Sequence, residues 1–332
     1  MIRFIENKYI SLIGVIAIVA GPFYDTVENK YLTGMIALLL ALSIFIIIVI
    51  EYFKGKKIGN SVVHIPIVIK VDDGVQAQYA MNELIKNIEN QYGYDDYKEI
   101  LIKYYSVNIE RLIYEETCGI KDFDTLINFA RIIKYNISQL ENILNKQIKL
   151  HVAFYRRPAV AFLIGTMFRT NSLCIYQIDN KNEFKKVADI ANRKYKERID
   201  EFKKYKITED INDNLNDNLN DEVLVVINSA SHSVNTNSDD LKIYKNIVKI
   251  DLKEPGTIPY ENDWSDYAQE IYNVFNKLQT NFKSIVVAHS MPESLAIILG
   301  MGFGEYWNIT ITQYHNGLYP KQYTMNQIKY YF

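Results

Sequence analysis

Two long apolar runs open the chain. Residues 9–23 contain no charged side chain, and neither do residues 31–50, with a short polar connector between the two runs. A helix of about 20 apolar residues is long enough to cross a bilayer, and a shorter one can span with slight local thinning. The pattern therefore predicts a hairpin of two transmembrane helices. We expect the first span at residues 9–24 and the second at residues 31–53, within a membrane segment of residues 1–57.

Basic residues predict the orientation of this hairpin. Arg3 and Lys8 precede the first run, and Lys54, Lys56 and Lys57 follow the second, whereas the connector has an acidic excess. Positive flanks stay on the cytoplasmic side. We therefore expect a multi-pass protein of a bacterial inner membrane with both termini in the cytoplasm. A cleaved signal peptide is the alternative for the first run, but no A-x-A site follows it.

After the hairpin, short runs rich in Val and Ile alternate with amphipathic stretches. Such continuous apolar runs are typical of strands that are buried on both faces. The expected strands are His64–Val71, Lys149–Tyr155, Ser172–Ile178, Glu222–Asn228, Asn246–Leu252, Ser284–Ser290 and Asn308–Tyr314. The expected helices are Gln76–Tyr92, Asp124–Asn145, Asn182–Tyr205 and Asp263–Leu278. Alternation of strands and helices predicts a parallel, Rossmann-like α/β arrangement.

A polar segment, Thr208–Glu222, interrupts this alternation with a tandem NDNL repeat. Acidic, low-complexity segments cannot bury enough apolar surface to form a core. We therefore expect a flexible linker at residues 208–221, which divides a first lobe at 58–207 from a second lobe at 222–332.

The two lobes share an internal repeat. An offset of 135 positions aligns the segment that begins at His151 with the segment that begins at Val286. Each segment is followed by a strand, and a one-residue gap in this part of the alignment brings Gln177 opposite Gln313. Both segments read as strand, polar turn, proline, apolar helix, glycine and strand. The aligned pairs are Ala153 and Ala288, Ala161 and Ala296, Leu163 and Ile298, Gly165 and Gly300, and Phe168 and Phe303. Each turn places the N-terminus of a helix at the carboxyl end of a strand, where anions are favoured. The repeat predicts a pseudo-symmetric cleft.

Composition and motifs narrow the function. The formal net charge is −2, so no basic excess exists to hold a DNA or RNA polymer. The two cysteines, Cys118 and Cys174, lack metal-ligand spacing. None of the usual nucleotide-binding, metalloprotease or hydrolase motifs is present. We therefore expect no catalytic residues, no metal and no cofactor.

The segment His289–Tyr319 resembles the C-terminal signature of SAVED domains. In that family a strand precedes a helix with the pattern P-x-x-x-A-x-x-L/I-G, then a strand and a tyrosine-containing tail, and Pro292, Ala296, Gly300 and Tyr319 match this pattern. The resemblance implies a SAVED domain built from two fused Rossmann-like (CARF-like) lobes. SAVED domains are cyclic-oligonucleotide sensors of bacterial CBASS and CRISPR antiphage systems.

A cyclic oligonucleotide requires cations for its phosphates, aromatic rings for its bases and polar groups for the base edges. Arg156 and Arg157 can bind phosphate in bidentate fashion, and Tyr155 can stack on a base. Asp72 and Asp73 follow the first strand, and because they would repel phosphate we exclude them. The expected ligand-binding residues are Tyr155, Arg156, Arg157, Asn228, Ser229, Ser231, His232, His289, Ser290, Met291, Glu293, Tyr314 and Tyr319.

The expected function is a ligand-gated membrane effector of antiphage immunity, not an enzyme. The activating ligand would be a cyclic tri- or tetranucleotide, or a cyclic dinucleotide. Binding would favour a homo-oligomer that gathers the hairpins in the lipid bilayer and disrupts the membrane, causing growth arrest or cell death. The alternative is a membrane-tethered nucleotide hydrolase or phosphodiesterase. Ser290 lies on a strand–turn–helix, as a hydrolase nucleophile does, but no partner base can be named for it.

Overall fold

The computed structural model describes most of the chain beyond residue 61. The described residues are 34, 38, 41–49, 62–72, 76–116, 122–179, 181–191, 194–211, 220–303 and 307–331. The chain forms two compact units. The first consists of Met1–Val62 with Glu99–Val107, and the second of Val63–Lys98 with Asn108–Phe332.

The expected transmembrane hairpin falls almost wholly outside the described residues. Of its two spans, at 9–24 and 31–53, only residues 34, 38 and 41–49 are described, and these are helical. Within the described parts of the chain, none of the helices has both the length and the apolar character that a bilayer crossing requires. The hairpin stays a prediction.

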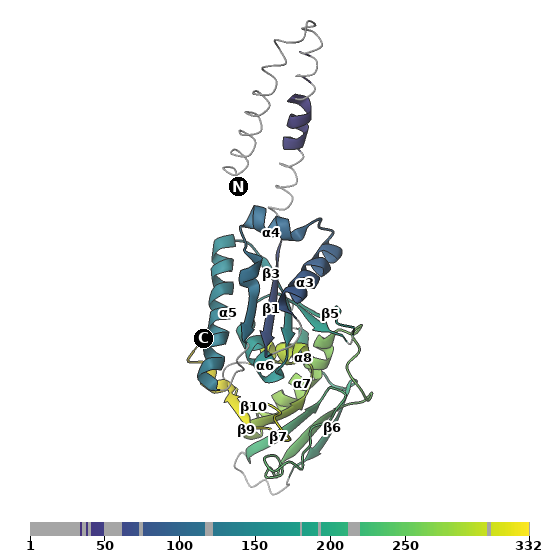
Figure 1. Cartoon of the computed structure of the whole chain (residues 1–332). Helices are drawn as coiled ribbons and strands as arrows, with labels where there is room; N and C mark the ends of the chain where they lie inside the picture. Colours follow the sequence, from purple (N-terminus) through teal and green to yellow (C-terminus); the bar gives the residue numbers. More distant parts are fainter. Residues whose placement is uncertain are drawn as a thin grey trace. The chain divides into compact units, whose positions relative to one another are not determined.

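The second unit contains two mixed β-sheets, and Figure 1 shows helices α6 and α8 between them. The strands of the first sheet are β1 (Val63–Val71), β2 (Ile113–Glu116), β3 (Ile148–Tyr155), β4 (Leu173–Ile178) and β5 (Phe184–Ile190). Those of the second are β6 (Tyr205–Asp210), β7 (Asn220–Asn228), β8 (Ile247–Leu252), β9 (Phe282–Ser290), β10 (Ile309–Thr312) and β11 (Lys321–Thr324). The helices of the second unit are α3 (Ala77–Tyr92), α5 (Phe123–Leu144), α6 (Pro158–Met167), α7 (Trp264–Leu278), α8 (Glu293–Gly302) and α9 (Met325–Ile328), with 3₁₀ turns at Ile109–Leu112 and Lys194–Lys196. Most of helix α4 (Tyr97–Tyr105) belongs to the first unit.

The two sheets have the same winding. The first has the order β2-β1-β3-β4-β5, and the second contains β8-β7-β9-β10-β11 with β6 added beside β8. In each sheet the first four of these strands are parallel and the last is antiparallel. This is the doubly wound order 2-1-3-4-5, present twice, as the internal repeat predicts.

Helices α6 and α8 form the shared core between the sheets. Every residue from Ala159 to Met167 and from Ser294 to Gly302 is buried. A helix that is apolar on all sides must be buried on all sides, which explains why these two segments lack a polar stripe. The helices cross at two glycines. A Cβ atom on Gly165 would overlap the carbonyl of Ile297, and one on Gly300 would overlap the carbonyl of Phe162.

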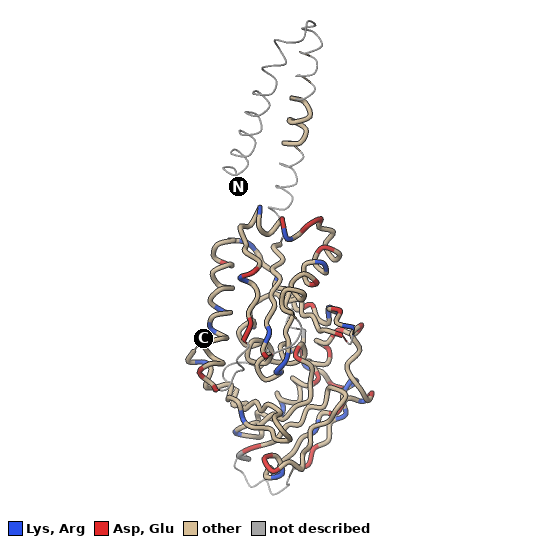
Figure 2. Tube along the Cα trace, in the orientation of Figure 1, with Lys and Arg blue, Asp and Glu red and all other residues tan. Residues whose placement is uncertain are grey.

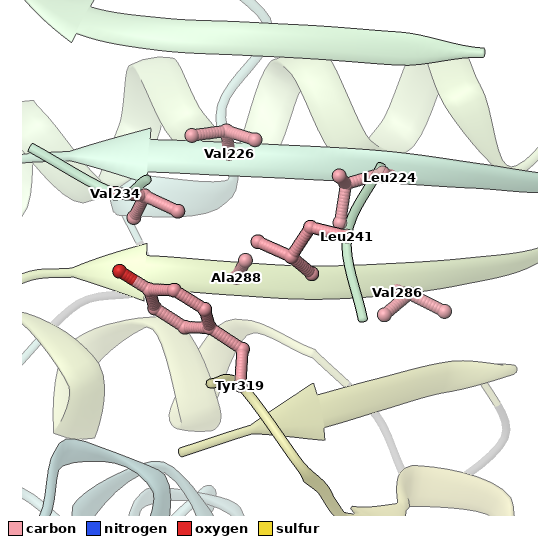
Figure 3. Close-up of a cluster of buried hydrophobic side chains, with 7 residues drawn as sticks. All are labelled: Leu224, Val226, Val234, Leu241, Val286, Ala288 and Tyr319. Atoms are coloured by element: carbon pink, nitrogen blue, oxygen red, sulfur yellow. The ribbon is translucent and has the colours of Figure 1, made fainter. Parts of the chain in front are cut away.

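The outer face of the second sheet differs from that of the first. In the first sheet the connection from β1 to β2 contains α3, which packs on β1. In the second, the connection from β7 to β8 is an irregular segment that contributes Val234 and Leu241 to an apolar cluster (Figure 3). The cluster contains Leu224, Val226, Val234, Leu241, Val286, Ala288 and Tyr319.

One expectation was wrong in this region and a second was wrong at its first residues, while residues 212–219 of the expected linker lie outside the described residues. The helix expected at Asn182–Tyr205 is instead strand β5, a 3₁₀ turn and the start of β6. Its charged residues suggested one helical face, but Asn182 adopts a positive φ of 63° in a turn that sends the chain back along β4. The expected linker begins with strand residues, because Thr208–Asp210 belong to β6 and pair with β8. An edge strand pairs through its backbone, so polar side chains do not prevent it.

Candidate functional site

Two turns, one from each sheet, converge in the second unit. We name Tyr155–Pro158, between β3 and α6, the first elbow, and Ser290–Glu293, between β9 and α8, the second elbow. Each follows the strand beside which the winding direction reverses. In doubly wound sheets, ligands bind at the carboxyl ends of the strands at this reversal.

The first elbow is basic and has an unusual backbone. Arg156 and Arg157 have φ values of 61° and 57°, in the left-handed region that disfavours L-residues by about 1–2 kcal/mol. Arg156 is exposed, whereas Arg157 forms an ion pair through Nε with the carboxylate of Asp72 at the end of β1. We excluded Asp72 as a phosphate contact on the basis of its charge. In the structure it holds Arg157, one of the two predicted phosphate-binding arginines, in place.

The second elbow carries an acid. Pro292 has an ordinary φ of −64°, and Met291 before it is buried. Burial raises the pKa of the Glu293 carboxyl above its usual range, and the nearby Arg156 opposes this shift. The Nε2 atom of Gln177 also lies 3.4 Å from Glu293 Oε2. The Glu293 carboxyl of the second elbow thus lies near Arg156 of the first elbow and contacts the end of β4.

Three buried polar atoms at the strand ends have no hydrogen-bond partner within the described structure: Tyr155 Oη, His289 Nδ1 and Ser290 Oγ. The Nε2 atom of His289 donates to the carbonyl of Thr312 at 3.0 Å. Burial lowers the pKa of His289 to about 4, so its imidazole is neutral at pH 7. Unpaired buried hydroxyl groups cost free energy, and one lies at each elbow, Tyr155 Oη at the first and Ser290 Oγ at the second.

The polar residues after β7 hold their own loop. Asn228 donates to Asp251 Oδ1 at 2.6 Å and accepts from the backbone N–H of Val234 at 2.8 Å. Ser229 is buried, shares a hydrogen bond of 2.8 Å with Tyr205 Oη, and donates its backbone N–H to the carbonyl of Ser290 at 2.7 Å. These are turn contacts, and Ser229 in addition ties the loop to the second elbow.

The remaining predicted contacts after these strands are Ser231, His232, Tyr314 and Tyr319. Ser231 and His232 are exposed in the turn that follows Ser229. Tyr319 is buried, and its hydroxyl accepts from the backbone N–H of Asn235 at 3.2 Å, so it packs the second lobe. Tyr314 is 55% exposed, with its ring 5.4 Å from that of Tyr319. Of these aromatic residues, Tyr314 is the one free to stack on a base.

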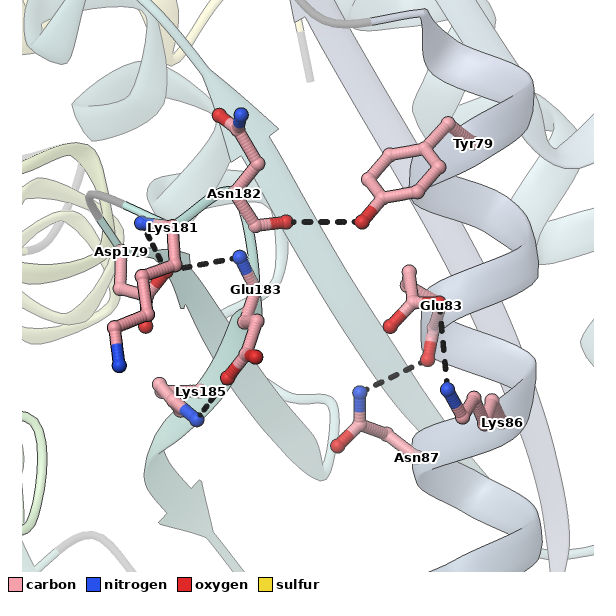
Figure 4. A network of polar contacts seen from close by, with 9 residues as sticks. All are labelled: Tyr79, Glu83, Lys86, Asn87, Asp179, Lys181, Asn182, Glu183 and Lys185. Carbon is pink, nitrogen blue, oxygen red and sulfur yellow. Dashed lines mark hydrogen bonds and ion pairs between the residues drawn. The ribbon is translucent and has the colours of Figure 1, made fainter.

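The turn between β4 and β5 borders the second elbow, since Gln177 at the end of β4 contacts Glu293. Asp179 fixes the turn by accepting the backbone N–H groups of Lys181 and Glu183 at 2.8 and 2.9 Å (Figure 4). Tyr79 of α3 donates to the carbonyl of Asn182 at 3.3 Å. This turn was not expected from the sequence, because a helix was predicted from Asn182 onward.

Electrostatics and cavities complete the description. Figure 2 shows Lys and Arg positions interspersed with Asp and Glu positions along both sheets. No group of three or more His, Cys, Asp or Glu side chains in the described ranges is arranged to hold a metal ion. A pocket of 440 Å³ lies at the opposite, amino-terminal edge of the first sheet, away from both elbows. It is lined by Glu141, Lys146, Gln147, Ile148, Arg169, Thr170, Asn171, Ser172, Ile190, Ala191, Tyr195 and Met301.

No family model matches the chain, and no curated protein matches it. Among solved structures, it is similar to the Acinetobacter baumannii Cap4 SAVED/CARF-domain containing receptor with the cyclic trinucleotide 3'3'3'-cAAA, with a TM-score of 0.48, 14% identity, and coverage of 78% of this chain and 51% of that chain. The same receptor with 2'3'3'-cAAA gives a TM-score of 0.48, 13% identity, and coverage of 89% and 61%. The Moraxella osloensis Cap4 receptor gives 0.43, 15%, 79% and 50%. This chain therefore spans between 50% and 61% of the length of those receptors.

Proposed function

We propose that this chain is a receptor for a cyclic oligonucleotide and that the ligand binds across the two elbows. The observation that carries the proposal is the position of the Glu293 carboxyl of the second elbow, which lies near Arg156 of the first elbow and 3.4 Å from Gln177 Nε2 at the end of β4. The points at which the strand order reverses in the two sheets therefore lie close together, as do the N-termini of α6 and α8. A ring of several phosphates is a ligand that can reach both at once.

The chemistry of the first elbow supports an anionic ligand. Arg156 is exposed beside the N-terminus of α6, and the guanidinium of Arg157 is fixed by Asp72. Fixed guanidinium groups bind phosphate oxygens with little further loss of side-chain freedom. Tyr314 offers an exposed ring for stacking on a base. The left-handed backbone at both arginines supports the same conclusion, since such strain concentrates at functional sites.

The output is a change at a membrane. The two N-terminal apolar runs are the parts of the sequence suited to a bilayer. Leu38, Leu42, Phe45, Ile46 and Ile47 are exposed apolar residues of the described helical stretch. Ligand binding would favour an oligomer in which the hairpins gather and disrupt the membrane. For this switch, the ligand must bind the assembled state more tightly than the free one.

Calorimetry tests the receptor. The purified full chain is titrated with cyclic di-, tri- and tetra-adenylate, and we expect saturable binding of at least one ring. The double variant Arg156→Ala/Arg157→Ala should lose about tenfold or more in affinity, because charge-assisted contacts contribute about 1.5–3 kcal/mol each. Arg131→Ala removes an exposed arginine from α5 and should bind as the wild type does. Absence of binding to every ring, or equal losses in both variants, would contradict the receptor proposal.

Dye release from liposomes tests the output. Full-length protein reconstituted in dye-loaded vesicles should release dye only when the bound ring is added. Release without ligand, or ligand binding without release, would overturn the membrane-disruption step and leave the receptor in place.

A membrane-tethered nucleotide hydrolase is the competing function. The buried, unpartnered Ser290 Oγ is the observation that favours it. The receptor is preferred because the described hydrogen bonds place no base on this hydroxyl. Chromatography of the ring after incubation separates the two, since a hydrolase would convert it to linear products and Ser290→Ala would abolish the conversion.

A further inference from the structure

The two central helices obey a local two-fold relation that extends to single atoms. Gly165 lies against the carbonyl of Ile297, and Gly300 against that of Phe162. These residues are related by the same offset of 135 that relates the two repeats. The elbow of each lobe is therefore placed relative to the other lobe by a helix crossing with no space for a side chain.

Neither helix is capped by its own lobe. The N-cap residues are Arg157 for α6 and Pro292 for α8, and neither makes a side-chain cap hydrogen bond. The first N–H groups of a helix have no partner within the helix. Buried N–H groups at these positions need an acceptor from elsewhere.

Each cap comes from the opposite lobe. The backbone N–H of Ala159 in α6 donates to Gln313 Oε1, which follows β10, at 3.3 Å. The backbone N–H of Ser294 in α8 donates to Gln177 Oε1 of β4, also at 3.3 Å. Further cross-lobe bonds flank them, from Tyr323 Oη to the carbonyl of Ala159 at 2.6 Å and from Ser294 Oγ to that of Tyr176 at 3.1 Å.

We propose that Gln177 and Gln313 are the positioning residues of the paired elbows, each fixing the elbow helix of the other lobe. The two side chains couple the elbows, so that a ligand bound at one elbow finds the other already in place. The ligand part of this inference rests on the proposed function. The caps that each lobe provides for the helix of the other do not depend on that function, and they can be tested without a ligand.

The two caps differ in one respect that sharpens the test. Gln177 also directs Nε2 toward Glu293 Oε2 at 3.4 Å, whereas proline occupies the aligned position, 158, of the first elbow. A glutamate in place of Gln313 keeps an acceptor for Ala159 and is favoured at a helix N-terminus. A glutamate in place of Gln177 would face the Glu293 carboxyl. We therefore expect Gln313→Glu to keep the first turn of α6 protected from hydrogen exchange, and Gln177→Glu to leave the first turn of α8 unprotected.

Hydrogen exchange of the full chain, read residue by residue, is the ligand-free test. Gln313→Leu should speed exchange in the first turn of α6 about tenfold, the equivalent of one lost hydrogen bond, and leave α8 unchanged. Gln177→Leu should do the reverse. Gln279→Leu changes an exposed glutamine at the end of α7 and should alter neither helix. Exchange that is unchanged at both helices, or faster only in the lobe that carries the substitution, would overturn the proposal.

Titration of the same variants with cyclic di-, tri- and tetra-adenylate is the second arm. Both leucine variants should bind about tenfold more weakly, whereas Gln279→Leu should bind as the wild type does. Wild-type affinity in both leucine variants would overturn the coupling. If the wild-type chain binds none of the rings, the proposed function fails. The hydrogen-exchange pattern still decides whether each helix is capped by the opposite lobe.

Discussion

The two elbows have the same position in two copies of one fold, yet their chemistry is opposite. The first has two arginines in left-handed conformation, and the second has a proline with an ordinary φ followed by an acid. The helices behind them are equivalent down to the glycines at which they cross. The two lobes thus share the parts that position the turns, while the residues at the turns themselves differ. A pseudo-symmetric site with one basic and one acidic half suits a ligand that carries both phosphates and base edges.

The largest effect should follow from breaking the shared crossing. Gly165→Ala places a Cβ atom on the carbonyl of Ile297, so the helices must separate. Because backbone cannot move aside as a side chain does, we expect a loss of about 4 kcal/mol in the free energy of unfolding. Gly317→Ala is the control, since it has open space and only a positive φ, and should cost about 1 kcal/mol. Urea unfolding measures both, and equal losses would show that the crossing is not tight.

The buried histidine of the second lobe should make stability depend on pH. The pKa of His289 falls from 6.5 to about 4 on folding, because burial disfavours the charged form. Below pH 6.5 the unfolded chain takes up a proton that the folded chain refuses. Stability should therefore fall as the pH drops from 6.5 to 4, by about 1.4 kcal/mol per pH unit for this residue.

His289→Asn keeps a donor for the Thr312 carbonyl. It should remove the part of the pH dependence of the free energy of unfolding, hereafter the slope, that His289 causes. His315→Asn alters an exposed histidine of the hairpin after β10 and should leave the slope unchanged. Urea midpoints at stepped pH compare the variants, and an unchanged slope in His289→Asn would contradict the assignment.

A smaller effect separates strain from binding at the first elbow. Arg156→Gly relieves the left-handed backbone and should raise the free energy of unfolding by about 1 kcal/mol. The same change removes an exposed cation, so affinity for any cyclic oligonucleotide that calorimetry finds to bind should fall about tenfold. Thermal unfolding and calorimetry should therefore move in opposite directions. Asn145→Gly changes another residue with positive φ, at the end of α5, and should alter stability without affecting affinity.

The smallest expected effect concerns the acid of the second elbow. Glu293→Gln keeps the shape and the acceptor oxygen but removes a charge that repels phosphate. Affinity for an anionic ring should rise about threefold, as a partly screened charge contributes less than about 1 kcal/mol. A marked loss of affinity in calorimetry would instead mean that the carboxylate accepts from a base edge, and the two elbows would then divide phosphate and base recognition between them.

Much of the fold is determined locally by the sequence. Continuous apolar runs gave the central strands, with bounds that differ by only a few residues from those observed, because burial on both faces leaves no room for polar side chains. The lack of a polar stripe in the segments after Pro158 and Pro292 likewise requires two fully buried helices. Even the alignment of Gln177 with Gln313 was visible as part of the repeat. The strands and helices among these features depend on residues close together in the chain.

Tertiary structure alone decided the remainder. Strands β5 and β6 pair through their backbones at sheet edges, so their polar side chains carried no signal. The ion pair between Arg157 and Asp72, and the caps that Gln177 and Gln313 give to the opposite lobe, join positions far apart in the chain. The sequence indicates which side chains can accept a hydrogen bond, but only the packing of one lobe against the other determines which donor each of them meets.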